Sequence, residues 1–339
     1  MKEKKVFFFH PGWPKTATKS IQFGIFQKLI SFNCYLRKDV SMHPYYGHKL
    51  LRPFLYNSKK INLGLIKREI FKNLDINKKT IYSDEVFLTI LLNNKIKKKY
   101  NLNLDQIIKK TKKIIPRPYF IFTIRNQEEY LKSWYNQTSY KNKKFSREDF
   151  LKSINKSFKN KGPIDLEMLD YYKVIKTYKK YFPKSKIKIL LFEDFTNNYN
   201  FFKKKIISIL NISKKDFSNF KKLKINTSSD RKSHKFYRLY ANFRTHFFPN
   251  FQFSRFFGVK KRILTDTPLE KYYGPVEKIT IFMDNFFQGN KVKKIDTTIP
   301  KDIKMKIKTR FYTSNKKLDS EFKLSLKKYN YFFSKEHYD

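Results

Sequence analysis

Four short apolar runs stand out along the chain and predict strands that are buried on both faces. They occupy residues 6–9, 80–82, 119–124 and 187–192. Strands of a parallel sheet are near-continuous apolar runs, because helices cover both faces of such a sheet. The runs therefore predict a central parallel sheet.

The segments between these runs show the spacing of helices that have one apolar face. Apolar side chains recur at helical intervals after the first run, after the third run and over residues 165–181. The positions are Ile21, Ile25, Phe26, Leu29 and Ile30, then Tyr130, Leu131 and Trp134, then Leu166, Leu169, Tyr172, Val174, Ile175 and Tyr178. Strands that alternate with helices predict a three-layer α/β fold in which helices flank a central parallel sheet.

The pattern changes after about residue 215, where the chain is rich in Lys and less regular. Helical periodicity returns near residues 268–288 and 299–329. A chain of 339 residues is long enough for one large domain with an appended region. We therefore expect an α/β core over residues 1–235, with a helical C-terminal region over residues 236–339 that packs on the same domain.

The turn after the first run concentrates groups that bind anions. Ligands of open parallel sheets bind beyond the carboxyl ends of the strands, so this turn is a candidate site. Lys15 and Lys19 supply charge, Thr16, Thr18 and Ser20 supply hydroxyl groups, and a helix is expected to start near Ser20. Free N–H groups and the dipole at a helix N-terminus attract phosphate or sulfate. The alternative is an ordinary basic helix cap without a ligand.

This turn does not match the phosphate-binding motif GxxxxGK[ST] of nucleotide triphosphatases. Counted from Gly12, that motif requires Gly and then Lys where the chain has Ala17 and Thr18. Lys15 also comes too early, next to Pro14. The mismatch counts against a P-loop small-molecule kinase, which remains the main alternative enzyme.

A second candidate site lies at the end of the third run, where Arg125 follows directly. Ser133 comes eight residues later, on a predicted helix. An Arg side chain offers permanently charged donors in a planar fork that suits phosphate. The alternative is a surface ion pair between Arg125 and Glu128 or Glu129.

Together the two segments resemble the sulfotransferases that use 3′-phosphoadenosine 5′-phosphosulfate (PAPS), in their bacterial and glycan-modifying branch. Residues 14–18 with Ile21 and Gln22 are similar to the family's 5′-phosphosulfate loop, PK[ST]G[ST][ST]xLQ, and Arg125 with Ser133 resembles its 3′-phosphate motif. The resemblance covers roughly residues 5–235 and is strong only at short segments. It implies a P-loop-like fold and PAPS binding by Lys15, Thr16, Ala17, Thr18, Lys19, Ser20, Arg125 and Ser133.

The chain departs from the family within the loop. Lys19 stands where the family usually has Ser or Thr, and Ser20 stands where the animal cytosolic enzymes have an adenine-stacking Trp. Adenine recognition is therefore unassigned, with Trp13 or another aromatic residue as candidates. Glu193 and Asp194 resemble a further family segment, and we expect them to orient a loop rather than to react.

The resemblance implies in-line transfer of a sulfuryl group from PAPS to an acceptor hydroxyl or amine, without a metal. Lys15 would stabilise the leaving phosphate. Glu85 is the first choice for the general base, since it ends a segment that resembles the family's SDE sequence, and Asp84 is a weaker choice. His43 and His48 are further candidates for the base because their ordinary pKa suits that role.

Family members also close over the nucleotide with a basic loop. Arg231 and Lys232, in the polar basic stretch 226–235, are candidates for that loop.

The composition is strongly basic, with 76 Lys and Arg against 28 Asp and Glu and a formal net charge of +48. Such an excess favours anionic partners, and a carbohydrate acceptor fits it best. A genome with AT-rich codons would give the same abundance of Lys. The charge also permits peripheral membrane contact or a non-enzymatic polyanion-binding protein, with aromatic residues at 247–257 as a stacking platform. We expect no specific nucleic-acid partner.

Cys34 is the one cysteine, which excludes an intramolecular disulfide and a Cys-based metal site. The His residues show no zinc-ligand spacing. The apolar run at residues 6–9 is too short for a signal peptide, and no stretch has the length of a membrane span. We therefore expect a cytoplasmic enzyme without a metal, and the sequence leaves its acceptor and oligomeric state open.

Overall fold

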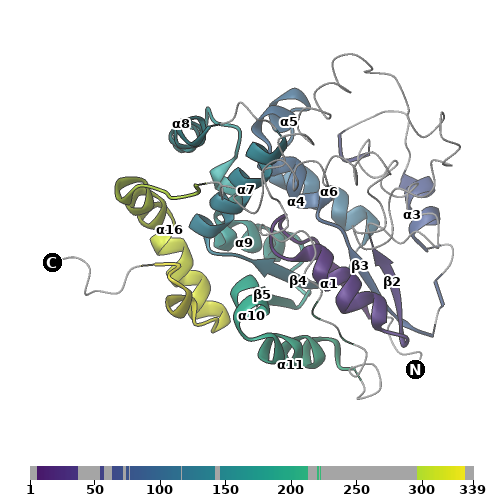
Figure 1. Ribbon diagram of the computed structural model, residues 1–339. Helices are drawn as coiled ribbons and strands as arrows, with labels where there is room; N and C mark the ends of the chain where they lie inside the picture. The colour runs from purple at the N-terminus through teal and green to yellow at the C-terminus, as the bar shows by residue number, and fades with distance from the viewer. Residues whose placement is uncertain are drawn as a thin grey trace, which may run out of the picture.

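Five parallel strands form the central sheet in the part of the chain that the structure, a computed structural model, describes (Figure 1). The described residues are 6–36, 54–56, 63–71, 74–75, 77–115, 117–141, 146–212, 220, 222 and 296–332. The strands are β1 Phe7–His10, β2 Phe32–Leu36, β3 Lys79–Ser83, β4 Tyr119–Ile124 and β5 Ile187–Leu191. They lie in the order β2-β3-β1-β4-β5. The four predicted strands and the parallel sheet are confirmed.

Strand β2, at one edge of the sheet, was not predicted. It pairs with β3, with Cys34 opposite Ile81. Its second residue, Asn33, donates a hydrogen bond from Nδ2 to the carbonyl oxygen of Asp75 at 2.6 Å and accepts one from the Asp75 N–H at 3.1 Å. A polar residue inside an edge strand breaks the continuous apolar run that marks the central strands.

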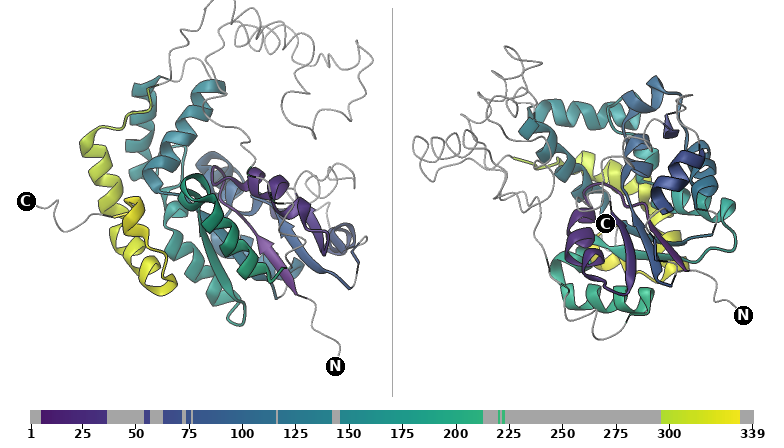
Figure 2. Two further views of the ribbon diagram at one scale, coloured as in Figure 1. Left: turned by 60° about the horizontal axis from the view of Figure 1, so that its bottom comes forward. Right: turned by 90° about the vertical axis from the view of Figure 1, so that its right-hand side faces the viewer.

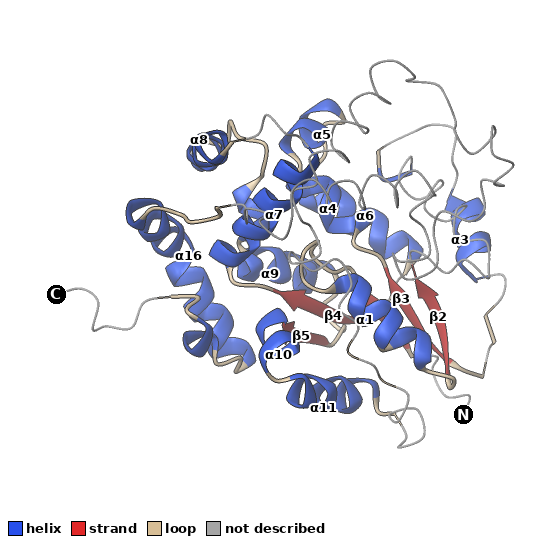
Figure 3. Ribbon diagram, in the orientation of Figure 1, coloured by secondary structure: helices blue, strands red, loops and turns tan. Residues whose placement is uncertain are grey.

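Alternating side chains of β1, β3, β4 and β5 pack into two separate apolar cores. Phe8 of β1 packs in one core with Ile121, and the next residue, Phe9, packs in the other with Phe120. The pleat of a strand sends successive side chains to opposite faces of the sheet. Helices cover both faces, so the molecule has the three layers that the sequence predicted (Figure 3).

The helices divide between these two cores. Apolar side chains reach the core around Phe8 from α1 Thr18–Gly24, η1 Phe26–Lys28, α10 Phe192–Asn197 and α11 Tyr199–Leu210. The core around Phe9 receives them from α3 Leu63–Phe71, α4 Val86–Leu92, α5 Asn94–Lys99, α6 Leu104–Ile114, α7 Gln127–Lys141, α8 Arg147–Phe158, η2 Leu166–Leu169, α9 Tyr171–Tyr181, α16 Lys301–Phe322 and η5 Leu326–Tyr329.

The helix after β1 is shorter than its apolar spacing predicted. It starts at Thr18, ends at Gly24 and is followed by the short η1. Leu29 is buried, but Ile30 is 66% exposed. The chain must turn here to enter β2 at Phe32, so the helical spacing does not continue through Ile30.

The helical segment predicted over residues 165–181 is divided into η2 and α9. Asp170 lies at the break, where its side chain accepts a hydrogen bond from the Lys173 N–H at 2.9 Å and caps α9. The hydroxyl of Ser314 also donates to Asp170. The break therefore follows from a helix cap that contacts α16, on a distant part of the chain.

Helix α16 belongs to the same packed body as the sheet (Figure 2). Its buried side chains, among them Phe311 and Leu318, join the core that contains Phe9. The helix packs against α9 and α7. The predicted boundary at residue 235 and the predicted helix near 268–288 lie outside the described residues, so both stay predictions.

The strand order changes direction between β1 and β4. These two strands are neighbours, with Phe8 opposite Tyr119 and Phe9 opposite Phe120. After β1 the chain crosses to β2 at one edge of the sheet, and after β4 it crosses to β5 at the other edge. The connections therefore diverge at this point, which is where open α/β sheets bind their ligands.

Candidate active site

The loop after β1 adopts a conformation that is suited to binding an anion. Lys15 and Ala17 have positive φ angles of 69° and 59°, and Thr16 between them does not. Alternation of this kind turns successive main-chain N–H groups toward one side, where they form a concave nest for an anion. Ala17 adopts this left-handed conformation although it is not a glycine. The conformation is unfavourable by about 1–2 kcal/mol for a residue that has a Cβ atom.

Hydroxyl groups brace this loop from inside. Thr16 donates from Oγ1 to the carbonyl oxygen of Trp13 at 2.6 Å, and Thr18 donates to the same oxygen at 3.1 Å. Both Thr side chains are buried. Their protons therefore point at the main chain, and a role for these two hydroxyls toward an anion stays a prediction.

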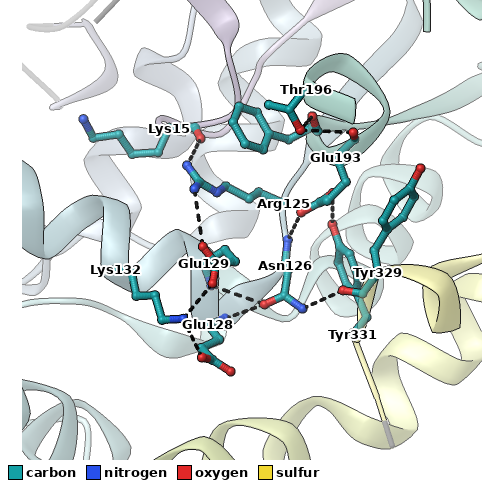
Figure 4. A network of polar contacts seen from close by, with 11 residues as sticks. Lys15, Arg125, Asn126, Glu128, Glu129, Lys132, Glu193, Thr196, Tyr329 and Tyr331 are labelled. Carbon is teal, nitrogen blue, oxygen red and sulfur yellow. Dashed lines mark hydrogen bonds and ion pairs between the residues drawn. The ribbon is translucent and has the colours of Figure 1, made fainter. Parts of the chain in front are cut away.

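Arg125 reaches the loop from the tip of β4 (Figure 4). Its Nη1 donates to the carbonyl oxygen of Lys15 at 3.2 Å, and its Nη2 lies 3.9 Å from a carboxylate oxygen of Glu129. The guanidinium carbon lies 4.3 Å from the centre of the Phe192 ring. The structure thus brings Arg125 and Lys15 together, and it also forms the ion pair with Glu129 that the sequence allowed.

The buried guanidinium retains an unused donor. Nε of Arg125 has no hydrogen-bond partner among the described residues. Burial lowers the pKa of Arg125, while the carboxylates of Glu129 and Glu193 act in the opposite direction. Arg carries five N–H donors, and a buried polar group without a partner is unfavourable. An anion bound beside the guanidinium would balance its charge.

Glu85 and Asp84 follow β3 and have different environments. Asp84 is buried, and its Oδ1 accepts a hydrogen bond at 2.9 Å from the N–H of Val86, the first residue of α4. Glu85 is half-buried. Burial raises the pKa of Tyr130, the negative charge of Glu85 raises it further and Arg125 opposes the rise. Glu85 and Arg125 therefore lie within electrostatic reach of one buried tyrosine.

A buried histidine, His10, lies at the end of β1 between β3 and β4, and sequence reasoning missed it. His10 Nδ1 lies 2.8 Å from the hydroxyl of Ser83, and its Nε2 lies 3.0 Å from the hydroxyl of Thr123. Gln22 of α1 donates to the carbonyl oxygen and the hydroxyl of Ser83 at 2.8 and 3.0 Å. These bonds tie together the ends of β1, β3 and β4. Burial lowers the pKa of His10 to about 3, so the ring is neutral.

Trp13 cannot stack on adenine in this structure, which corrects one candidate role. Its side chain is fully buried, and its Nε1 donates to the carbonyl oxygen of Met168 at 2.8 Å. The ring packs against Phe122 and Tyr171 in the core. Its position directly after β1 made Trp13 a candidate for stacking on a ligand. The residues that enclose it lie on a distant strand and helix, so the sequence did not indicate its burial.

The remaining candidates fall into two groups. Ser20 is buried and Lys19 half-buried on α1, and Ser133 is half-buried two turns beyond Arg125 on α7, so their binding roles stay predictions. His43, His48, Arg231, Lys232 and the aromatic residues at 247–257 lie outside the described residues.

Within the described ranges, no three His, Cys, Asp or Glu side chains are grouped so that they could hold a metal ion. In the same part of the chain, no helix combines the length and the apolar character that crossing a bilayer requires.

Comparisons with known proteins identify a distant structural likeness. No protein-family model matches the chain, and no curated protein does. Among solved structures, the chain is similar to a sulfotransferase from Alicyclobacillus acidocaldarius, with 14% sequence identity and a TM-score of 0.41. The match covers 62% of this chain and 82% of that one. A likeness this distant does not indicate what the chain does.

Proposed function

We propose that this protein is a sulfotransferase that moves a sulfuryl group from PAPS to an acceptor hydroxyl or amine. The observation that carries the proposal is the contact between Arg125 and Lys15 at the divergent ends of β4 and β1. Lys15 belongs to a loop with nest geometry, and Arg125 has an idle buried donor. PAPS carries a phosphosulfate at one end of its ribose and a phosphate at the other, so two adjacent anion sites fit it.

On the donor side, the main-chain N–H groups of residues 15–20 would hold the 5′-phosphate. The Lys15 ammonium would neutralise charge on the oxygen that bridges phosphorus and sulfur. Arg125, with Ser133, would bind the 3′-phosphate through the fork of the guanidinium. PAPS supplies an activated sulfuryl group, and the protein holds it in line with the acceptor.

On the acceptor side, Glu85 would take the proton. The acceptor oxygen forms a bond to sulfur while the bond from sulfur to the phosphate oxygen breaks, and adenosine 3′,5′-bisphosphate leaves. Glu85 is half-buried and shares Tyr130 as an electrostatic neighbour with Arg125. This placement favours Glu85 over Asp84, whose carboxylate is buried and bound to the N–H of Val86.

The acceptor that best fits the charge is a carbohydrate. A protein with a formal net charge of +48 attracts anionic glycans and repels cationic substrates. The cytoplasmic location expected from the sequence stays a prediction.

Calorimetry with adenosine 3′,5′-bisphosphate tests the proposal directly. The wild-type protein should bind this product, and Lys15→Ala and Arg125→Ala should each weaken the binding. Transfer of labelled sulfate from PAPS to a panel of glycans, lipids and phenols would then identify the acceptor.

Two results would overturn the assignment. One is the absence of any heat from folded protein at millimolar bisphosphate. The other is an increase in melting temperature with ATP and Mg²⁺ but none with PAPS, which would favour the small-molecule kinase instead.

A further inference from the structure

The last described turn of the chain lies against the carboxyl ends of β4 and β5, close to Arg125 (Figure 4). Residues 329–331, at the end of η5, are called the C-terminal clasp here. Asn126 Nδ2 donates to the carbonyl oxygens of Tyr329 at 3.1 Å and of Asn330 at 2.9 Å. The clasp therefore holds the residue that follows Arg125 in the chain.

Asn126 also makes contacts in two other directions. Its side-chain oxygen accepts hydrogen bonds from the N–H groups of Glu128 at 3.0 Å and Glu129 at 3.2 Å, at the start of α7. Its own N–H donates to Oε1 of Glu193 at 2.8 Å. Asn126 thus connects the clasp, α7 and the residue that follows Phe192, the ring under the guanidinium.

Glu193 is held at both carboxylate oxygens. Its Oε1 accepts from Asn126, and its Oε2 accepts from the hydroxyl of Tyr331 at 3.0 Å. The carboxylate is buried, which raises its pKa, while these two bonds and the charge of Arg125 oppose the rise. With both oxygens bound, the carboxylate has one orientation beside Arg125.

Tyr331 is itself anchored. It is 1% exposed, and its carbonyl oxygen accepts a hydrogen bond from Nδ2 of Asn315 at 2.8 Å. The side-chain amides of Asn315 and Gln127 bind each other at 3.0 and 3.1 Å. The C-terminal part of the chain therefore holds both residues that follow Arg125.

We propose that Tyr331 is a positioning residue that, through Glu193 and Asn126, holds Arg125 in the orientation that grips the 3′-phosphate. The inference rests on the proposed function, since it concerns the same site. The side chain of Arg125 makes one hydrogen bond to the protein, at Nη1, and Nε makes none among the described residues. The orientation of the side chain therefore depends on the groups around it, which are the Phe192 ring and the carboxylates of Glu129 and Glu193. A ligand-binding side chain that is free to change orientation contributes much less to affinity than one that is fixed.

The test compares wild type, Tyr331→Phe and Tyr329→Phe in calorimetry with adenosine 3′,5′-bisphosphate and adenosine 5′-monophosphate. Tyr331→Phe removes only the hydroxyl that donates to Glu193. Tyr329→Phe is the matched control, because its hydroxyl donates to Asp194 at 2.6 Å instead. Tyr331→Phe should lower the preference for the bisphosphate over the monophosphate about tenfold. The control should keep the wild-type preference.

A double-mutant cycle separates positioning from general stability. If Tyr331 acts through Arg125, then Tyr331→Phe in an Arg125→Ala background has no further effect on bisphosphate affinity. Glu193→Asp keeps the charge but shortens the side chain, so it breaks the same link from the other end. Glu193→Asp should also reduce the preference for the bisphosphate over the monophosphate. It replaces Tyr331→Phe as the test if that variant does not fold.

The outcomes distinguish the inference from the function beneath it. Wild type that binds neither nucleotide contradicts both. Wild type that prefers the bisphosphate, together with a Tyr331→Phe or Glu193→Asp variant that retains the full preference, overturns the inference and leaves the sulfotransferase intact. The inference is also wrong if Tyr329→Phe loses the preference to the same extent.

Discussion

Nη1 of Arg125 donates a hydrogen bond of 3.2 Å to the main-chain oxygen of Lys15, across 110 positions of the sequence. The bond joins the tips of β4 and β1, which are neighbours in the sheet. It places a buried positive charge beside a loop whose main chain is shaped for an anion. The two halves of the proposed nucleotide site are therefore in direct contact.

Arg125→Lys should weaken the binding of adenosine 3′,5′-bisphosphate by about tenfold or more. A lysine keeps the charge but lacks the planar fork, and a hydrogen bond to a charged group contributes about 1.5–3 kcal/mol. Calorimetry measures the change. Arg147→Lys is the control, since that guanidinium binds the carbonyl oxygen of Thr298 on the surface. Unchanged affinity in Arg125→Lys would contradict a phosphate grip.

Glu85→Gln should lower kcat by about 10²–10⁴-fold, because general-base catalysis contributes on that scale. The affinity for the bisphosphate should not change, since Glu85 is assigned to the acceptor side. A sulfate-transfer assay and calorimetry measure the two quantities. Glu148→Gln, in the first turn of α8, is the control. A full kcat in Glu85→Gln would shift the role of the base to His43 or His48.

Ala17→Gly should stabilise the fold, and Gly12→Ala should destabilise it. Ala17 has φ 59°, a left-handed conformation that glycine adopts without strain. Glycine also makes the unfolded chain more flexible, which offsets part of this gain, so the net stabilisation should be about 0.5–1 kcal/mol. A Cβ at Gly12 would lie 2.9 Å from Oγ1 of Thr18, at φ 20°. Urea denaturation measures both free energies of unfolding. The loop would not have the described geometry if Ala17→Gly were destabilising.

His10 should make the protein less stable as the pH falls below about 6.5. The unfolded chain has the ordinary pKa of 6.5, and burial lowers the folded value to about 3. The stabilisation is complete above pH 6.5 and is lost as the pH falls toward 3, because only the unfolded state takes up the proton. Relative to His10→Gln, the free energy of unfolding should fall by about 1.4 kcal/mol per pH unit. Parallel pH profiles of the two proteins, from denaturation between pH 4 and 7, would contradict this prediction.

Phe311→Ala should destabilise the whole protein by about 3–5 kcal/mol, since Phe311 of α16 is 2% exposed in the core that contains Phe9. Met305→Ala, at a position that is 38% exposed on the same helix, should change stability by less than about 0.5 kcal/mol. Denaturation followed by circular dichroism and fluorescence checks whether one transition is affected. A separate transition for the C-terminal part would contradict a shared core.

The pattern of apolar and polar residues predicted those features that depend on neighbouring residues alone. The bounds of β4 were predicted to the residue, because its side chains form one apolar run that is buried on both faces. Anion binding by the turn at Lys15 was predicted from consecutive residues that supply charge and main-chain donors, and it stays a prediction. Where a segment has partly polar character, as β2 does at Asn33, the same reading failed.

The tertiary structure decided which of these segments meet. No local pattern indicates that β1 lies between β3 and β4, that Trp13 is enclosed by Phe122 and Tyr171, or that Tyr331 holds a carboxylate 138 positions away. Apolar spacing records only that a side chain is buried, and many partners could bury it equally well. The choice among them is made when all the strands and helices pack at once, and that choice places Arg125 beside Lys15.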